Sequence, residues 1–277
     1  GLGIAGDYNA FIFGKATVTA SLRGNLAAGG DTTTSSVDIN MSNGNKVPYA
    51  IVTGGNLDFT NGTVYGNIIH QGEFNKVDSG SIISGTYRKV TDTLIDFASA
   101  QQYYVNLSNQ LATVPQNGTT ELKYNGLYIK GDHSVNIFNL TADYFNQAGW
   151  TNVTASSGST MIYTITGSTV NVHKAFDLPQ NTTGNNILYN FPDATAVNIS
   201  GVEIKGSILA PKAALNISNG NVYGNVIAAS LSTASCYIAI LPYTGPVPVP
   251  TPTPTPSPSS NPLVRTIIKF SEMTITA

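Results

Sequence analysis

Leu57–Ile69 reads LDFTNGTVYGNII, and Leu215–Ile227 reads LNISNGNVYGNVI. The two stretches agree or nearly agree at almost every position, which indicates an internal repeat. In each of them apolar and polar residues alternate around an Asn-Gly pair, a pattern typical of short strands joined by a turn. The repeat therefore predicts two equivalent strand segments with four positions facing the interior. These positions are Val64, Ile68, Val222 and Val226.

A shorter echo of the repeat has glycine, then Asn or Ser, then an aliphatic pair. It begins at Gly24, Gly66, Gly206 and Gly224, and the last two glycines are 18 residues apart. Short repeats that cannot bury a face by themselves must stack on their neighbours, which is the signature of a solenoid. We therefore predict an all-β protein, a β-solenoid. The alternative is an ordinary β-sandwich with Asn-Gly hairpins.

One segment departs from the strand pattern. Between Thr91 and Val114 the spacing is helical, with one stripe formed by Leu94, Phe97, Ala98, Gln101, Val105, Ser108, Leu111 and Ala112. Thr91 or Asp92 is the expected N-cap, and Val114-Pro115 closes the helix because the residue before proline avoids helical backbone. We expect this long helix to lie against the side of the β-body. A second, short helix is expected over Ala142–Gln147, before Gly149.

The composition restricts the classes of partner. Charged residues make up 10% of the 277 residues, against about 25% in an ordinary soluble domain. The net charge of −2 comes without a basic cluster, which argues against nucleic acid and anionic membrane surfaces as partners. No stretch approaches the roughly 20 apolar residues of a membrane span. The single cysteine, Cys236, excludes a disulfide within the chain, and we expect it to be a small buried side chain.

The sequence offers no catalytic, metal-binding or cofactor-binding constellation, so we predict that the protein is not an enzyme. The three histidines lack zinc-ligand spacing, and four aspartates sit beside glycines or turns. These residues are His70, His133, His173, Asp7, Asp31, Asp58 and Asp193. A β-helix enzyme acting on polysaccharide would need a cleft with convergent acids. Ice binding would need a flat threonine face, and Tyr65 and Tyr223 interrupt the best rows.

Several segments resemble a known family when they are taken in order. They include GLGIAGDYNAFIFG at the start, GGNLDFTNGTVYGN, NIFNLTADYFNQAGWTNV, ILYNFPDATAVNIS, GSILAPKAALN and GNVYGNVIA. Together they resemble the choice-of-anchor A domain of secreted bacterial proteins, some of which are labelled collagen-binding. The C-terminal segments are also similar to the ice-binding β-solenoid family, which carries a long helix beside a three-faced β-helix. The resemblance implies an exported or cell-surface module and no catalytic residues.

The chain divides into three regions. Residues 1–245 form the predicted solenoid domain, in which Leu241–Gly245 (LPYTG) is read as the exit turn of the last strand and not as a sortase signal. Residues 246–260 are a proline-rich linker containing Pro246, Pro250, Pro254 and Pro258. Residues 261–277 form a strand-forming tail that is too short to fold by itself. Its apolar residues are Leu263, Val264, Ile267, Ile268, Phe270, Met273 and Ile275.

We predict from the tail that the protein is an exported, extracellular subunit. Copies of the chain would polymerise into a surface fibre by donating the C-terminal strand to a neighbouring copy. The linker reaches about 45 Å in polyproline II, which is about the diameter of a compact domain of this length. The alternative is a cell-surface adhesin for host matrix, such as collagen, or for polysaccharide. A broad groove lined by tyrosines and Trp150 would favour this alternative.

Overall fold

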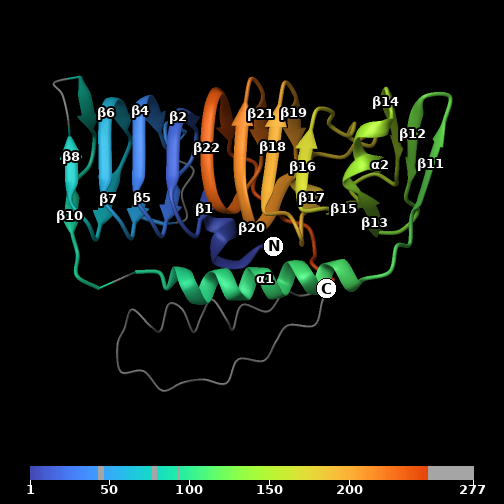
Figure 1. The fold of residues 1–277 in the computed structure, drawn as a ribbon, viewed down its shortest axis with the longest axis horizontal. Helices are drawn as coiled ribbons and strands as arrows, with labels where there is room; N and C mark the ends of the chain where they lie inside the picture. Colours follow the sequence, from blue (N-terminus) through green and yellow to red (C-terminus); the bar gives the residue numbers. More distant parts are fainter. Residues whose placement is uncertain (43–46, 77–79, 93, 249–277) are drawn as a thin grey trace, which may run out of the picture.

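The computed structural model describes residues 1–42, 47–76, 80–92 and 94–248. Its main body is a solenoid of stacked parallel strands, and helix α1 (Phe97–Thr113) lies along one side of it (Figure 1). The predicted fold class, an all-β solenoid with one long flanking helix, is confirmed. The predicted C-terminal strand falls outside the described residues.

The solenoid is built from two runs of strands. The first run is β1 (Ala10–Ile12), β2 (Ala16–Leu22), β3 (Leu26–Ala28), β4 (Thr32–Ile39), β5 (Tyr49–Thr53), β6 (Leu57–Val64), β7 (Asn67–His70), β8 (Phe74–Lys76), β9 (Ser81–Ile83) and β10 (Tyr87–Lys89). The second run is β13 (Val135–Thr141), β15 (Thr160–Thr166), β16 (Thr169–Val172), β17 (Ile187–Asn190), β18 (Ala196–Ser200), β19 (Glu203–Lys205), β20 (Ser207–Ser218), β21 (Asn221–Tyr223) and β22 (Val226–Ala239).

The two runs meet in the middle of the body. The first run grows from the centre to one end, α1 returns along the side, and the second run grows from the other end back to the centre (Figure 1). There β22 pairs in parallel with β1, Ala10 opposite Val226, and with β2, Thr17 opposite Ser232. The first and last coils of the chain are therefore neighbours, which the repeat did not predict.

Each coil contributes to three faces. The helix face, under α1, contains β13, β15, β17, β1, β3, β5, β7, β10 and the first parts of β20 and β22. The second face, called the ladder face below, contains β16, β18, β2, β4, β6, β8 and the middle parts of β20 and β22. The third face contains β19, β21, β9 and the ends of β22, β2, β4 and β6.

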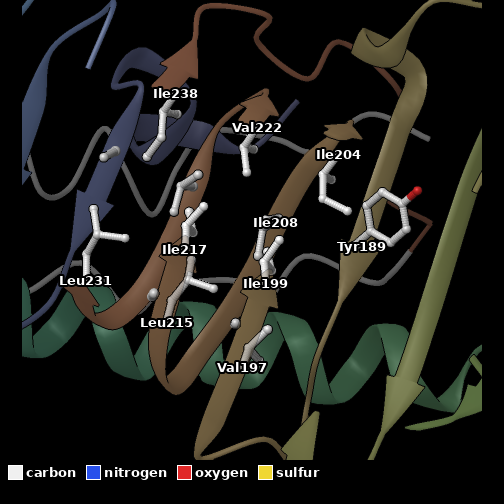
Figure 2. Close-up of a cluster of buried hydrophobic side chains, with 14 of the residues drawn as sticks. Tyr189, Val197, Ile199, Ile204, Ile208, Leu215, Ile217, Val222, Leu231 and Ile238 are labelled. Atoms are coloured by element: carbon white, nitrogen blue, oxygen red, sulfur yellow. The ribbon is translucent and has the colours of Figure 1, made fainter. Parts of the chain in front are cut away.

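Alternate side chains from all three faces fill the interior. Figure 2 shows this core around Val197, Leu215, Ile217 and Val222, which point toward one another from neighbouring coils. The four residues predicted from the repeat are all buried: Val64 0%, Ile68 1%, Val222 0% and Val226 0% exposed. The prediction that both copies occupy inward-facing strands is therefore confirmed.

The Gly-Asn echo marks one corner of the coil. Asn25 and Asn225 are buried and Asn67 is half-buried. Each side-chain oxygen accepts a backbone N–H of an adjacent segment, from Asn9, Tyr243 and Thr86 respectively, at 3.1, 2.8 and 3.0 Å. The Asn9 and Tyr243 N–H groups are buried and need a partner, because an unpaired buried N–H is costly. The echo is thus a repeated side-chain cap for a corner of the main chain.

Helix α1 begins later than predicted. Its N-cap is Asp96, whose carboxylate accepts the Ser99 N–H at 3.0 Å, so the expected caps Thr91 and Asp92 lie outside the helix. The buried stripe is correspondingly shifted: Ala98 is exposed. The fully buried residues are Ala100, Tyr104, Leu107, Ser108 and Leu111.

Tyr104 is the main anchor of α1 on the helix face. Its hydroxyl donates to Leu2 O at 2.5 Å and accepts the Ala5 N–H at 3.1 Å, so its polar tip is satisfied inside the apolar layer. Phe97, from the predicted stripe, is half-buried with its ring 5.5 Å from that of Phe11.

One end of the solenoid carries a separate small sheet. It consists of β11 (Thr119–Lys123), β12 (Gly126–Lys130) and β14 (Trp150–Thr154), next to the short helix α2 (Ala142–Gln147). The bounds of α2 are those predicted. Leu127, Ile129 and Val153 belong to the main core cluster, so the sheet closes this end of the interior (Figure 1). We call it the end cap.

Candidate adhesive surface

Most residues predicted to act in assembly lie outside the described residues. This holds for Leu263, Val264, Ile267, Ile268, Phe270, Met273 and Ile275, and for Pro250, Pro254 and Pro258 of the linker. Pro246 is described and is half-buried. The assembly strand therefore stays a prediction.

The LPYTG stretch is part of the folded body. Tyr243 is 3% exposed; its N–H donates to Asn225 Oδ1 at 2.8 Å and its hydroxyl to Pro246 O at 2.7 Å. The Thr244 N–H donates to Asn185 O at 2.9 Å, and Val247 is fully buried. Burial raises the pKa of the Tyr243 phenol far above its usual range. The interpretation as an exit turn fits this packing.

The ladder face carries a continuous row of short side chains. The strand register places eight of them side by side across both runs: Asn171, Asn198, Asn216, Ser232, Thr17, Thr33, Asp58 and Asn75. All eight are exposed or half-buried. At about 4.8 Å between strands, the seven intervals give a row about 34 Å long.

Side-chain hydrogen bonds order this row. Asn198 donates to the Asn171 side-chain oxygen at 2.9 Å, and Asn216 donates to that of Asn198 at 2.8 Å. At the other end Asn75 donates to Asp58 at 2.7 Å. Each amide is thus fixed by its neighbour, and the row is a regular array of polar groups.

On the strands of the second run, the residues on both sides of the row also have short side chains. One flanking row is Thr169, Ala196, Ala214 and Ser230, and the other is Ser200, Ser218, Ala234 and Thr19. None of these side chains is charged. Charge enters in the first run, with Asp58 of β6 in the row itself and Glu73 just before β8. Glu73 pairs with Lys89, and this hydrogen bond lowers the pKa of Glu73.

The third face differs in chemistry. The Tyr223 and Tyr237 rings meet edge to face at 5.6 Å with their hydroxyls hydrogen-bonded, and the Arg23 guanidinium lies 5.2 Å from the Tyr237 ring centroid. The bond to Tyr237 and the nearby charge of Glu203 raise the pKa of Tyr223 to about 12. Trp150 lies on the end cap, beside Tyr128 and away from Tyr223 and Tyr237.

The candidate ionisable residues do not converge. His70 is buried with Nδ1 2.8 Å from Gly72 O, whereas His133 and His173 are exposed. Within the described part of the chain, no three His, Cys, Asp or Glu side chains gather as metal ligands would. Asp58 lies within β6, not at a turn as expected. Cys236 is half-buried rather than buried, with Sγ 3.7 Å from Ile217 O.

The sequence did not reveal the ladder row. Its members are separated in sequence by unequal intervals, because coil length differs along the body: Asn171 to Asn198 spans one coil, and so does the shorter step from Asn198 to Asn216. A search for threonine at a constant spacing therefore misses it. The repeated N-I-S and N-I-S-N-G stretches at Asn198 and Asn216 were the available signal.

A protein-family model described as "Putative Ice-binding-like adhesive domain" matches residues 1–236. Among solved structures, an ice-binding protein from the Antarctic ascomycete Antarctomyces psychrotrophicus is 13% identical with a TM-score of 0.43, over 86% of this chain and 97% of that chain. A glycosylated ice-binding protein (LeIBP) from an Arctic yeast is 14% identical with a TM-score of 0.41, over 94% and 96%.

The competence-associated pilin ComZ from Thermus thermophilus is 11% identical with a TM-score of 0.37, over 88% of this chain and 72% of that chain. These structural likenesses are too distant to carry an argument about function. A search of curated proteins found no match. The helices in the described ranges are too short or too polar to cross a bilayer.

Proposed function

The chain belongs to the ice-binding-like adhesive domain family, and from this membership and the ladder face we propose that it attaches an exported protein to an uncharged polysaccharide surface. The observation that supports the proposal most is the eight-residue polar row that crosses both runs of the solenoid in register. Its role is binding rather than catalysis, and it needs no cofactor. The choice-of-anchor A resemblance stays a prediction.

The chemistry of the ladder face suits a neutral, hydroxyl-rich polymer. Amides and hydroxyls both donate and accept hydrogen bonds, and those of Asn216 and Ser232 are exposed. Three rows span about 13 Å along the strands, so the face covers about 450 Å². This is well below the roughly 800 Å² that each partner contributes to a standard protein interface. A single contact is therefore weak, and firm attachment needs several copies.

The test compares two substitutions in strand β2. Thr17 lies in the ladder row, whereas Ser21 lies on the third face, and both are half-buried. Thr17→Lys and Ser21→Lys add the same charge to two different faces, the ladder face and the third face. We expect Thr17→Lys to weaken binding to insoluble cellulose or chitin about tenfold, because the lysine must lose water at the contact. Ser21→Lys should bind as the wild type does.

Three results would argue against the proposal. Equal binding by both variants would remove the ladder face from the contact. Binding to fibrillar collagen, but to neither polysaccharide, would assign the domain to host matrix. Thermal hysteresis that is lost in Thr17→Lys would make ice the partner.

Strand donation is a second candidate, and an open strand edge at one end of the described solenoid supports it. At the end opposite the end cap, β8, β9 and β10 each pair with one described strand only. Ile82 and Tyr87 there are 57% and 56% exposed. An unpaired parallel edge with apolar side chains is a template for another strand, such as that predicted over residues 261–277.

The place where the chain leaves the solenoid determines how far the tail must reach to the β10 edge. Val247 is buried on the helix face, directly after Thr244, whose N–H donates to Asn185 O just before β17, and Gly245, which lies against Thr160 at the start of β15. From β15 the β10 end lies eight strand spacings away on the helix face, about 38 Å. A linker with a reach of about 45 Å can therefore serve its own solenoid as well as a neighbour.

Light scattering at increasing concentration separates these cases. We expect a chain lacking residues 261–277 to stay monomeric while the full chain assembles with concentration. Ile82→Lys in a full chain should also prevent assembly, and mixing it with the truncated chain should restore pairs. Assembly by the truncated chain would rule out donation, and a full chain that is monomeric at every concentration would indicate pairing within one copy.

A further inference from the structure

The outer surface of the end cap exposes aromatic side chains. Leu127, Ile129 and Val153 face the core, so Tyr128 and Trp150 point outward. Trp150 is 42% exposed, and the Tyr124 side chain in the loop between β11 and β12 is 83% exposed. Large exposed aromatic groups on the outer side of a capping sheet are not needed to close the core, and exposed apolar patches mark interaction sites.

The indole of Trp150 is held in one orientation. It lies against Gly126, where a β-carbon would come within 2.5 Å of the ring. Tyr128 meets it edge to face at 5.2 Å, with the planes at 74°. The Lys123 ammonium lies 4.6 Å over the Tyr128 ring and pairs with Glu121 at 3.0 Å. The ring is therefore a fixed platform whose surroundings are locally neutral.

The loop that carries Tyr124 is strained. Tyr124 and Asn125 have φ of +51° and +59°, a conformation that two-residue hairpin loops require and that Asn and Gly adopt more readily than Tyr. The loop is tied to β14 because the Gly149 N–H donates to Asn125 O at 2.8 Å. A bulky ring kept at a strained, exposed position is a mark of a functional site.

The far end of the same sheet has a polar hollow. Its volume is about 290 Å³, and it is lined by Lys130, Gly131, Asp132, Thr154, Ala155 and Ser156. Lys130 and Thr154 are the last residues of β12 and β14, on the same side as Trp150. Four residue steps, about 13 Å, separate the platform from the hollow. The surface thus combines an aromatic platform with hydrogen-bonding groups, and the distance between them is about the length of a short oligosaccharide.

The size and charge of this surface identify its occupant. The outer face of the three strands is about 13 Å by 10 Å, so it offers about 130 Å², far less than the roughly 800 Å² per partner of a stable protein interface. Lys123 is neutralised by Glu121, and Lys130 lies near Asp132 in the hollow, so no net field recruits a charged partner. A pyranose ring has an apolar C–H face and a rim of hydroxyls, which matches both parts.

We propose that the outer face of the end cap is a second, independent glycan-binding site, in which a neutral pyranose stacks on Trp150 beside Tyr124 while its hydroxyls reach the Lys130–Ser156 hollow. The site is separate from the ladder face and does not depend on it. It gives the adhesive domain an end-on contact for a single sugar chain, in addition to the flat side-on surface.

The chain has one tryptophan, so its fluorescence reports on this site without a label. The probes are neutral hexasaccharides of β-1,4-glucan, β-1,4-mannan and α-1,4-glucan. We expect one of them to change the emission of Trp150 saturably. Calorimetry should then show binding that is weaker by about tenfold or more in Trp150→Thr and Tyr124→Asn. Asn is compatible with the positive φ at 124, so this second variant keeps the loop.

Two control variants and one further test variant make the experiment decisive. Tyr87→Thr removes an exposed ring at the opposite end of the solenoid and should leave binding unchanged. Gly126→Ala keeps the indole but displaces it, and should weaken binding although the ring is present. Thr17→Lys on the ladder face should have no effect. Circular dichroism and melting check that each variant is folded.

Defined results would overturn the proposal. The first is Trp150 emission that none of the three sugars changes. The second is equal binding by Trp150→Thr and the wild type. The third is hexasaccharide binding that is lost in Thr17→Lys only. An emission change that follows protein concentration without sugar would assign the face to a second copy of the chain.

Discussion

Replacing Asn225 by alanine tests how the two runs of the solenoid are joined. Asn225 is 3% exposed, at the corner where the last coil meets the first. Its Nδ2 donates to Tyr8 O at 2.8 Å, and its Oδ1 accepts the Tyr243 N–H at 2.8 Å. The alanine variant leaves both buried backbone groups without this partner.

The expected loss follows from these two groups. Each buried group left unsatisfied costs about 1–3 kcal/mol, so Asn225→Ala should lower the free energy of unfolding by about 2–6 kcal/mol. The repeat supplies a matched control, because Asn67 has the same place in the first copy. Its bonds to Thr86 N and Pro48 O are exposed to solvent, where water replaces them, so Asn67→Ala should cost about 1 kcal/mol or less.

Urea denaturation followed by circular dichroism measures both variants. The midpoint of Asn225→Ala should fall strongly while the slope m stays that of the wild type, because the same surface is exposed on unfolding. Hydrogen exchange should also show faster opening of β1 and β22. Equal losses in the two variants would show that the buried amide does not hold the junction.

Other expectations follow from the backbone and the tyrosines. Gly62→Ala, at φ +101° beside the Val37 carbonyl, should lower stability by at least about 2 kcal/mol, whereas Gly158→Ala, at φ +73° in open space, should cost about 1 kcal/mol; thermal melting compares them. Asp96→Ala removes the N-cap of α1 and should cost about 1 kcal/mol in the same assay. Burial raises the pKa of the half-buried Tyr103 and of five buried tyrosines, Tyr8, Tyr104, Tyr163, Tyr189 and Tyr243. Since the unfolded pKa of these five is about 10, each keeps its proton only in the folded state above that pH, and stability should fall by about 1.4 kcal/mol per pH unit for each. Phenolate absorbance that rises for all 14 tyrosines before unfolding would contradict this.

The repeat could be read from the sequence because its pattern is local. Val64 and Val222 lie inside because alternation along a strand dictates it, and the Gly-Asn corners recur because each coil needs the same cap. The meeting of β22 with β1 could not be read, because periodicity indicates stacking but not which coil adjoins which. Helix α1 was predicted, but its start was placed too early. Thr91, Asp92 and Asp96 are all acceptable N-caps, and only the packing of Tyr104 selects among them.

The two candidate surfaces were missed for different reasons. The ladder row depends on coils of unequal length, so Asn171 and Asn216 become neighbours of Asn198 only in the folded register. The end cap has no repeat: Trp150 stands out by its type, but the glycine that orients it, Gly126, lies on a strand that is remote in sequence.

Helix α1 also acts as a ruler for the number of coils. It forms the central part of the connection that returns the chain from one end of the body to the other (Figure 1), so a longer stack needs a longer connection. Each coil adds about 4.8 Å, and each helical residue about 1.5 Å. One extra coil needs about three residues, which turns Tyr104 and Leu107 away from the helix face. Two coils, about 9.6 Å, match seven residues, about 10.5 Å, or nearly two whole turns. Relatives of this domain should therefore lengthen by pairs of coils together with a heptad in the helix.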